Sequence, residues 1–232
     1  MKIGILQTGQ SPDVLREEAG DYPDMFERLL AGRGLEFVRY DVENMELPKD
    51  VHDCEGWLIT GSRHGAYEDH PFIAPLEQFI RDTVAANVPL VGICFGHQII
   101  AQALGGRVEK YPQGWAVGPQ DYDFEGEAIT LNAWHQDQVT EIPSTAKPIA
   151  QNDFCRYPAL IYGDRAFSVQ AHPEFRDGFV DGLMATRGQG VVPEPLMQAA
   201  RARLGQPNGS QRIAEMIADF FLQDRALARP ES

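Results

Sequence analysis

The stretch VPLVGICFGHQIIAQALGG, residues 88–106, decides the fold because it joins an apolar run to a helical pattern through a single cysteine. Residues 89–93 form a short continuous apolar run, as expected for a parallel strand buried on both faces. Residues 97–104 then have the apolar spacing of a helix, which a glycine pair ends. Glycines stand two residues before and two residues after Cys94, where small residues let a strand and a helix approach closely. The motif G-x-C-x-G therefore predicts a sharp strand-to-helix turn that holds the thiol clear of the sheet.

Outward from this stretch, the chain alternates between the patterns of strands and helices. Apolar spacing typical of helices occurs in residues 23–31 and 76–84. Residues 2–7 form an apolar run typical of a buried strand, and residues 35–42 and 56–60 are further predicted strands. Several short β-prone runs follow residue 106, and ALIYGDRAFSVQ, residues 159–170, predicts a hairpin. We therefore expect an α/β fold with an open, mostly parallel sheet, helices on both faces and antiparallel edge strands.

No internal repeat or low-complexity linker divides the chain. We expect residues 1–175 to form one α/β domain and residues 176–232 to form a C-terminal helical extension packed on that domain. Apolar residues between 213 and 221 have helical spacing, and Ser210 precedes them as the expected helix cap.

The composition excludes some classes of partner. Lys and Arg number 20 and Asp and Glu number 34, so the net charge of −14 opposes binding to nucleic acid and to anionic membrane surfaces. The chain has no signal peptide pattern and no apolar run long enough to cross a bilayer. Its three cysteines do not form a disulfide framework, which favours a cytoplasmic location. Nothing in the sequence indicates the oligomeric state.

A second motif supplies what a reactive thiol needs. FSVQAHPEF, residues 167–175, ends a predicted strand with His172 and Glu174 on either side of a proline. Residues two apart on a strand point the same way, so Glu174 is expected beside the imidazole of His172. A thiol nucleophile requires a general base, and the base requires an orienting acceptor. An isolated H-x-E triplet is often a set of exposed polar residues with no catalytic role, but its combination with Cys94 favours a catalytic site.

The two motifs GICFGHQ and VQAHPE together resemble the class I glutamine amidotransferases, and the likeness extends from the first strand to about Phe175. The resemblance implies a catalytic triad with Cys94 as nucleophile, His172 as general acid and base, and Glu174 as its orienting partner. It also implies a γ-glutamyl thioester on Cys94, which forms as ammonia or another amine leaves and is hydrolysed by water.

The resemblance implies further site residues one at a time. The loop ITGSRHG is similar to the family's glycine-rich loop, so Gly61 and Ser62, with the N–H of Phe95, are the expected oxyanion donors. The family pattern in this loop is G-G-P, and this chain departs from it with Ser62 and Arg63. Gln98, on the predicted helix after Cys94, matches a glutamine that the family places near the substrate. The segment AWHQDQV resembles the family's S-H-x-D segment, with Trp134 where the family has serine. The expected substrate-binding residues are Gln98, Trp134, His135 and Asp137.

The other histidines have plainer interpretations. His97 is the alternative base, because it lies three residues after the thiol. His52, His64 and His70 stand in polar loops and are expected to be solvated. The chain lacks H-E-x-x-H, C-x-x-C and a G-x-G-x-x-G that follows a strand, so we expect no metal site and no cofactor.

Three functions stay open on these grounds. The first is a stand-alone cysteine hydrolase of γ-glutamyl amides or peptides, acting on a small-molecule substrate. The second is a glutaminase subunit that delivers ammonia to a separate synthetase, and the third is a catalytically silent binding protein on the same fold. An α/β-hydrolase with a cysteine nucleophile is less favoured, because its acid normally precedes the histidine in the chain.

Overall fold

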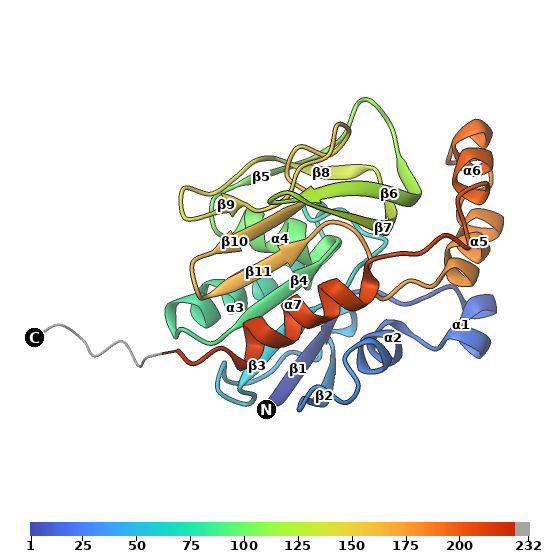
Figure 1. Cartoon of the computed structure of the whole chain (residues 1–232). Coiled ribbons are helices and arrows are strands. Elements are labelled where there is room, and N and C mark those ends of the chain that lie inside the picture. The colour runs from blue at the N-terminus through green and yellow to red at the C-terminus, as the bar shows by residue number, and fades with distance from the viewer. Residues whose placement is uncertain (226–232) are drawn as a thin grey trace, which may run out of the picture.

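A seven-stranded sheet forms the centre of the protein (Figure 1). The structure is a computed structural model and describes residues 1–225. The strand order in the sheet is β2-β1-β3-β4-β11-β10-β9. The strands are β1 (Lys2–Gln7), β2 (Glu36–Asp41), β3 (Gly56–Ile59), β4 (Leu90–Ile93), β9 (Lys147–Pro148), β10 (Ala159–Tyr162) and β11 (Ala166–Val169). The five strands from β2 to β11 pair in parallel, whereas β10 and β9 continue the sheet in antiparallel pairing. The expected α/β fold with antiparallel edge strands is confirmed.

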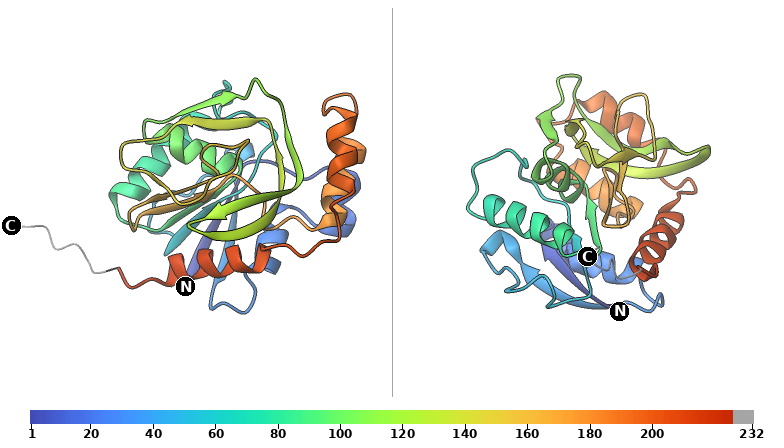
Figure 2. Two further views of the ribbon diagram at one scale, coloured as in Figure 1. Left: turned by 45° about the horizontal axis from the view of Figure 1, so that its top comes forward. Right: turned by 90° about the vertical axis from the view of Figure 1, so that its left-hand side faces the viewer.

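Helices cover both faces of this sheet, as the end-on view in Figure 2 shows. Helices α3 (Ile73–Ala85) and α4 (Phe95–Ala103) pack on one face, where Leu76, Ile80 and Ile100 share a core with Trp57 of β3. Helices α2 (Tyr22–Leu29) and α7 (Ser210–Leu222) pack on the other face. The central strands β3 and β4 are buried on both sides, which explains why their sequences are continuous apolar runs rather than alternating ones.

A separate β-layer lies above the carboxyl end of the sheet (Figure 1). Strands β6 (Ala116–Phe124) and β7 (Glu127–His135) form a long hairpin, and β5 (Arg107–Lys110) pairs with β8 (Asp137–Glu141). We expected antiparallel strands to join the main sheet, which is correct for β10 and β9 but not for these four. Within residues 1–225 they form two separate two-stranded sheets, because each of the four strands has a ladder with a single other strand.

The segment after residue 175 is helical and packs on the rest of the protein. Helices α5 (Asp177–Thr186) and α6 (Glu194–Arg201) share a third core with α2 and the β6–β7 hairpin. Helix α7 shares a core with β1, since Ile213 and Ile217 belong to one cluster with Ile3 and Ile5. Ser210 begins α7 but does not cap it, because the N-cap is Gly209, and the Ser210 N–H donates to Oδ1 of Asn208 at 3.2 Å. The boundary at residue 175 stays a prediction, and residues 226–232 lie outside the described part.

Two short helical elements complete the described chain. Helix α1 (Asp13–Ala19) was not expected, and it has no buried residues that would give it an apolar pattern. A 3-10 turn, η1 (Val42–Asn44), follows β2. No described helix combines the length and the apolar character that crossing a bilayer requires.

The turn between β4 and α4 depends on the absence of two side chains. A Cβ added at Gly92 would overlap the carbonyl oxygen of Gly96, and one added at Gly96 would overlap the carbonyl oxygen of Ile59 in β3. Both obstacles are backbone atoms, which do not move without displacing a strand or a helix. The two glycines therefore permit the close contact between α4 and strands β3 and β4 that the sequence motif predicted.

We predict that Gly96→Ala destabilises the protein by about 1–3 kcal/mol, the usual cost of forcing extra volume into a packed interior. The measurement is the free energy of unfolding in urea. The matched control is Gly178→Ala in α5, where an added Cβ meets nothing within 4 Å and the residue lies in a helix. Since alanine is the better helix former, this control should unfold at the same or a higher urea concentration. Equal stability of the two variants would contradict the packing account of the turn.

Candidate active site

Cys94 lies at the turn between β4 and α4 in an unusual backbone conformation. It is the N-cap residue of α4, with φ 54° and ψ −102°. A positive φ is uncommon for a residue with a side chain, and it costs free energy that the surrounding structure must supply. The backbone N–H of Cys94 donates to the carbonyl oxygen of Val169 in β11 at 2.9 Å, which ties the turn to the neighbouring strand. The thiol therefore stands at the N-terminus of a helix, where free amides favour negative charge.

His172 and Glu174 lie side by side, as the H-x-E motif predicted. The Nδ1–H of His172 donates to Oε1 of Glu174 at 2.7 Å, and both residues are buried. We expected the two residues to lie on one strand, and this was wrong. Strand β11 ends at Val169, and both residues occupy a turn beyond it. A single bridge to Asn132 of β7 holds this turn, with the His172 N–H donating to the Asn132 carbonyl oxygen at 2.8 Å.

An aromatic ring fixes the plane of the imidazole. Phe175 stacks on His172 with ring centroids 3.8 Å apart and planes 4° from parallel. Phe175 is held in turn by Tyr22 of α2 and Phe179 of α5, at centroid separations of 6.0 and 4.6 Å. The orientation of His172 therefore depends on α2 and α5, two helices far apart in the chain, which sequence patterns did not reveal.

The charge state of His172 follows from competing effects. Burial favours the neutral imidazole and lowers its pKa, whereas the negative charges and hydrogen bonds of Cys94 and Glu174 favour the imidazolium. The second group of effects is larger, and it raises the pKa of His172 from 6.5 to about 10. Because Nδ1 is bonded to Glu174, Nε2 is the nitrogen available to Cys94. Below the raised pKa, His172 is therefore protonated beside Cys94.

His97 lies elsewhere and lacks these contacts. It is fully buried in α4, and its Nδ1 is 2.8 Å from Oγ of Ser168. Burial, with a smaller effect from His135, lowers the pKa of His97 to about 3, so it is neutral at physiological pH. His97 does not line the cavity at Cys94. These facts favour His172 over His97 as the base.

The glycine-rich loop after β3 lies against the thiol and the imidazole. A Cβ added at Gly61 would lie 3.0 Å from Cε1 of His172 and 3.7 Å from Cβ of Cys94. Ser62 lines the cavity beside Cys94, and Phe95 is the first residue of α4. The loop and the helix N-terminus thus flank the thiol, as oxyanion donors must. Which N–H groups bind an oxyanion stays a prediction.

Two glutamines connect the thiol to the upper β-layer. The amide of Gln98 donates to the carbonyl oxygen of Asp137 at 2.8 Å and to Oε1 of Gln170 at 3.1 Å. The amide of Gln170 points to Sγ of Cys94 at 3.7 Å. Gln98 lines the cavity as expected, but its amide N–H groups are occupied by the protein. Gln170 was not predicted, because an isolated glutamine before His172 has no distinctive pattern.

The segment from Trp134 to Asp137 borders the same cavity. Burial, together with the nearby His172, lowers the pKa of His135 to about 3, so its imidazole is neutral. Its Nδ1–H donates to the carbonyl oxygen of Asp137 at 3.2 Å, while its buried Nε2 has no partner among the described residues. The Asp137 carboxylate accepts from the Tyr67 hydroxyl at 3.2 Å. A carboxylate at the cavity wall suits a ligand with an ammonium group.

The cavity at Cys94 has a volume of about 280 Å³ and a mixed wall. Trp115 and Trp134 form an aromatic side with ring centroids 5.8 Å apart. Several wall residues have no sequence motif and were not predicted: Tyr22, Tyr67, Lys110, Trp115 and Arg187. They come from five different segments, so only the folded chain brings them together.

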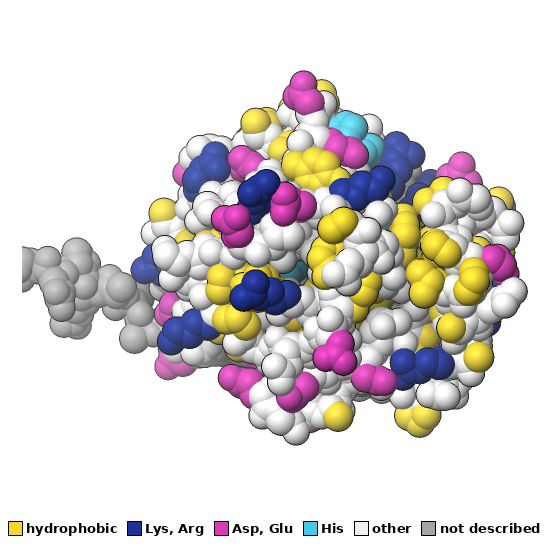
Figure 3. Space-filling view, turned by 90° about the horizontal axis from the view of Figure 1, so that it is seen from above, with side chains coloured by type: hydrophobic (Ala, Val, Ile, Leu, Met, Phe, Trp, Pro, Cys, Tyr) yellow, Lys and Arg dark blue, Asp and Glu magenta, His cyan; other side chains and the backbone are white. Residues whose placement is uncertain are grey.

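Over the face seen in Figure 3, acidic and basic side chains are interspersed.

The chain is similar to known proteins over most of its length. The family model described as glutamine amidotransferase class-I matches residues 25–184. Gamma-glutamyl peptidase 4 of Arabidopsis thaliana is 30% identical over 223 residues, which cover 88% of each chain. A component of the glutamine-hydrolysing GMP synthase of Archaeoglobus fulgidus is 31% identical over 164 residues, or 67% of this chain and 84% of that component. A solved glutamine amido transferase from Methylobacillus flagellatus has the same fold, with a TM-score of 0.72, 22% identity and coverage of 100% and 98% of the two chains.

We predict that Cys94→Ser lowers the pKa of His172, because serine removes the negative charge that opposes the effect of burial. The measurement is an NMR titration of labelled histidine side chains in the wild-type protein and the variant. The wild-type His172 should remain protonated as the pH rises through 8, and it should lose its proton near pH 10.

Cys54→Ser is the matched control, because Cys54 is a buried thiol that does not contribute to the shift at His172. An unchanged His172 pKa in Cys94→Ser would show that the thiol does not hold the imidazolium.

Proposed function

Because the chain belongs to the glutamine amidotransferase class-I family, we propose that it is a cysteine hydrolase of γ-glutamyl peptides and amides. Cys94 is the nucleophile, His172 the general acid and base, and Glu174 the residue that orients the imidazole. The observation that carries this proposal is the 2.7 Å contact of the buried His172–Glu174 pair, with the pKa of His172 raised next to Cys94.

Acylation is the first half of the reaction. The Cys94 thiolate attacks the γ-carbonyl carbon, and the carbonyl oxygen becomes an oxyanion that accepts from backbone N–H groups at Phe95 and in the Gly61–Ser62 loop. The tetrahedral intermediate collapses as His172 transfers its proton to the departing nitrogen. The amine leaves, and a γ-glutamyl thioester remains on Cys94.

Deacylation reverses these roles. His172 is now neutral and takes a proton from a water molecule, whose oxygen attacks the thioester carbonyl. Collapse of the second intermediate expels the Cys94 thiolate and releases glutamate, and His172 is again protonated. Glu174 holds Nδ1 throughout, so that Nε2 faces the reacting atoms in both halves.

The cavity wall supports a γ-glutamyl head group. The carboxylate of Asp137 would accept from its α-ammonium group, on the wall that carries Trp134 and His135. Gln98 acts indirectly, since its amide holds the Asp137 carbonyl and Gln170 in position. These binding roles are part of the proposal.

Arg187 supports a leaving group larger than ammonia. It lines the cavity and donates to the Tyr22 hydroxyl at 3.3 Å and to the Gln10 carbonyl oxygen at 2.8 Å. Among the described residues it forms no ion pair with a carboxylate, unlike Arg16 and Arg39, which each bond to acidic side chains. A guanidinium without an anionic partner suits the terminal carboxylate of a γ-glutamyl dipeptide or tripeptide.

The relatives also favour a hydrolase of γ-glutamyl peptides over a glutaminase that supplies ammonia. The relative named gamma-glutamyl peptidase aligns over 88% of this chain, and the GMP synthase component aligns over 67%. A glutaminase that supplies ammonia to a separate synthetase is the second candidate, and the likeness to the GMP synthase component is the observation that favours it. A cytoplasmic location is part of the proposal, supported by three free cysteines.

We predict that a glutamine analogue with a diazoketone in place of the side-chain amide labels Cys94 and stops turnover. Peptide mapping by mass spectrometry locates the label. Cys155→Ala is the matched control and should be labelled at Cys94 as the wild-type protein is, because burial raises the pKa of Cys155 to about 12 and leaves it unreactive. Labelling chiefly at Cys54 or Cys155, or no labelling, would count against the nucleophile and would favour the silent binding protein.

We predict that γ-glutamyl dipeptides have a higher kcat/KM than glutamine in the isolated protein, by tenfold or more, which corresponds to about 1.4 kcal/mol of barrier. Arg187→Gln should raise KM for dipeptides with a free carboxylate. It should leave KM for γ-glutamyl p-nitroanilide unchanged, because that substrate lacks the carboxylate. If glutamine is preferred tenfold, or if activity requires an added synthetase, the ammonia-supplying function replaces the one proposed.

A further inference from the structure

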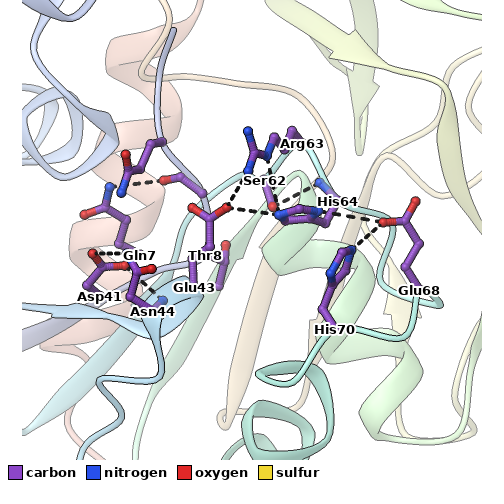
Figure 4. Close-up of polar contacts among 12 residues, drawn as sticks. Gln7, Thr8, Asp41, Glu43, Asn44, Ser62, Arg63, His64, Glu68 and His70 are labelled. Carbon is purple, nitrogen blue, oxygen red and sulfur yellow. Dashed lines mark hydrogen bonds and ion pairs between the residues drawn. The ribbon is translucent and has the colours of Figure 1, made fainter. Parts of the chain in front are cut away.

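Three side chains of the loop between β3 and α3 form a cluster outside the catalytic residues (Figure 4). They are His64, Glu68 and His70, and one ligand atom from each lies within 4.8 Å of the others. Nε2 of His70 is 2.8 Å from Oε2 of Glu68, and Nδ1 of His64 is 3.8 Å from the same oxygen. We expected both histidines to be solvated, but their rings contact each other with centroids 4.0 Å apart.

A fourth residue determines which nitrogen of His64 faces the cluster. Oε1 of Glu43 lies 3.0 Å from Nε2 of His64, on the side away from Glu68 (Figure 4). An ionised carboxylate only accepts, so Nε2 carries the hydrogen and Nδ1 keeps its lone pair. Metal-binding histidines are usually held in this way, with the second nitrogen donating to a carboxylate. Glu43 therefore prepares Nδ1 of His64 as a ligand.

The distances suit a small divalent cation. Zinc binds imidazole nitrogen and carboxylate oxygen at about 2.0–2.2 Å in a tetrahedron, so its ligand atoms lie roughly 3.4 Å apart. The observed separations of 2.8 and 3.8 Å lie on either side of that value. Small side-chain rotations would equalise them. Two imidazoles and one carboxylate fill three positions and leave the fourth to water.

The surroundings balance the charge of a divalent cation. Glu43 and Glu68 place one carboxylate on each side of the His64 imidazole. The guanidinium of Arg63 contacts Oε1 of Glu43 at 3.3 Å, and its Nε lies 3.5 Å from Nε2 of His64, farther than the 3.0 Å contact of that nitrogen with Glu43. Phe72 closes one side of the cluster, with its ring 5.9 Å from each imidazole.

We propose that His64, Glu68 and His70 bind a divalent transition-metal ion, best suited to Zn²⁺, and that Glu43 orients His64 for it. The metal would fasten the loop that carries Ser62, because the N–H of His64 donates to Oγ of Ser62 at 3.1 Å. His64 and Glu68 both line the cavity at Cys94, so the site lies at the edge of the candidate active site.

The test is a Zn²⁺ titration of metal-free, untagged, full-length protein by calorimetry. The Cys94→Ser background is used because it removes a thiol that would compete for zinc, since thiolate sulfur is a strong zinc ligand. One equivalent of Zn²⁺ should bind. His64→Ala and His70→Ala should each weaken binding at least tenfold, and Glu43→Gln should weaken it about tenfold, as loss of an orienting carboxylate does.

His52→Ala is the matched control, because His52 is an exposed histidine of the loop that precedes β3, and it should bind Zn²⁺ as the parent does. A His70→Cys variant loaded with Co²⁺ gives a positive signal, since a thiolate ligand adds a charge-transfer band in the near ultraviolet. Absence of saturable binding overturns the proposal. So does equal affinity in the parent and the His64→Ala and His70→Ala variants, or Co²⁺ binding to His70→Cys without the new band.

Discussion

The positive φ of Cys94 is the constraint on which the rest of the site depends. A residue with a side chain adopts this conformation only where the surrounding packing compensates for its cost. Here the compensation comes from the close contact of α4 with β3 and β4, which two glycines permit. The N–H of Cys94 is also fixed to β11. The strand that leads to His172 and the turn that carries the thiol are therefore joined directly, so the positions of the two groups are linked through the backbone.

The imidazole depends on a wider set of contacts. Its hydrogen-bond acceptor is two residues away, but the plane of its ring is set by Phe175, and Phe175 is packed by α2 and α5. Burial alone would favour the neutral imidazole of His172, and the negative charges of Cys94 and Glu174 favour the protonated form instead. The helices after residue 175 thus stabilise the site as well as covering the sheet. A hydrolase of this kind needs a rigid imidazole more than a mobile one, because the same nitrogen must face two different reacting atoms.

How much of this arrangement the sequence predicted depends on how local each feature is. The turn at Cys94 and the His172–Glu174 pair are each contained in a few residues, so G-x-C-x-G and H-P-E were sufficient to find them. The hairpin strand β6 was missed because Gly118 and Pro119 interrupt its pattern. Gln170, Phe175 and Arg187 act only through neighbours that are distant in the chain or lack a motif. The cluster at His64 has the spacing H-x3-E-x-H, which belongs to no common metal motif, and folding of the loop brings its ligand atoms together.

The rate at which iodoacetamide alkylates Cys94 at neutral pH shows whether His172 keeps the thiol reactive. The rate is compared between the wild-type protein and His172→Gln, with Cys94→Ser giving the background from the other two thiols. If the imidazolium stabilises the thiolate, the variant should react more slowly by roughly tenfold or more, because only the thiolate is nucleophilic. Equal rates in the wild-type protein and the variant would contradict the account.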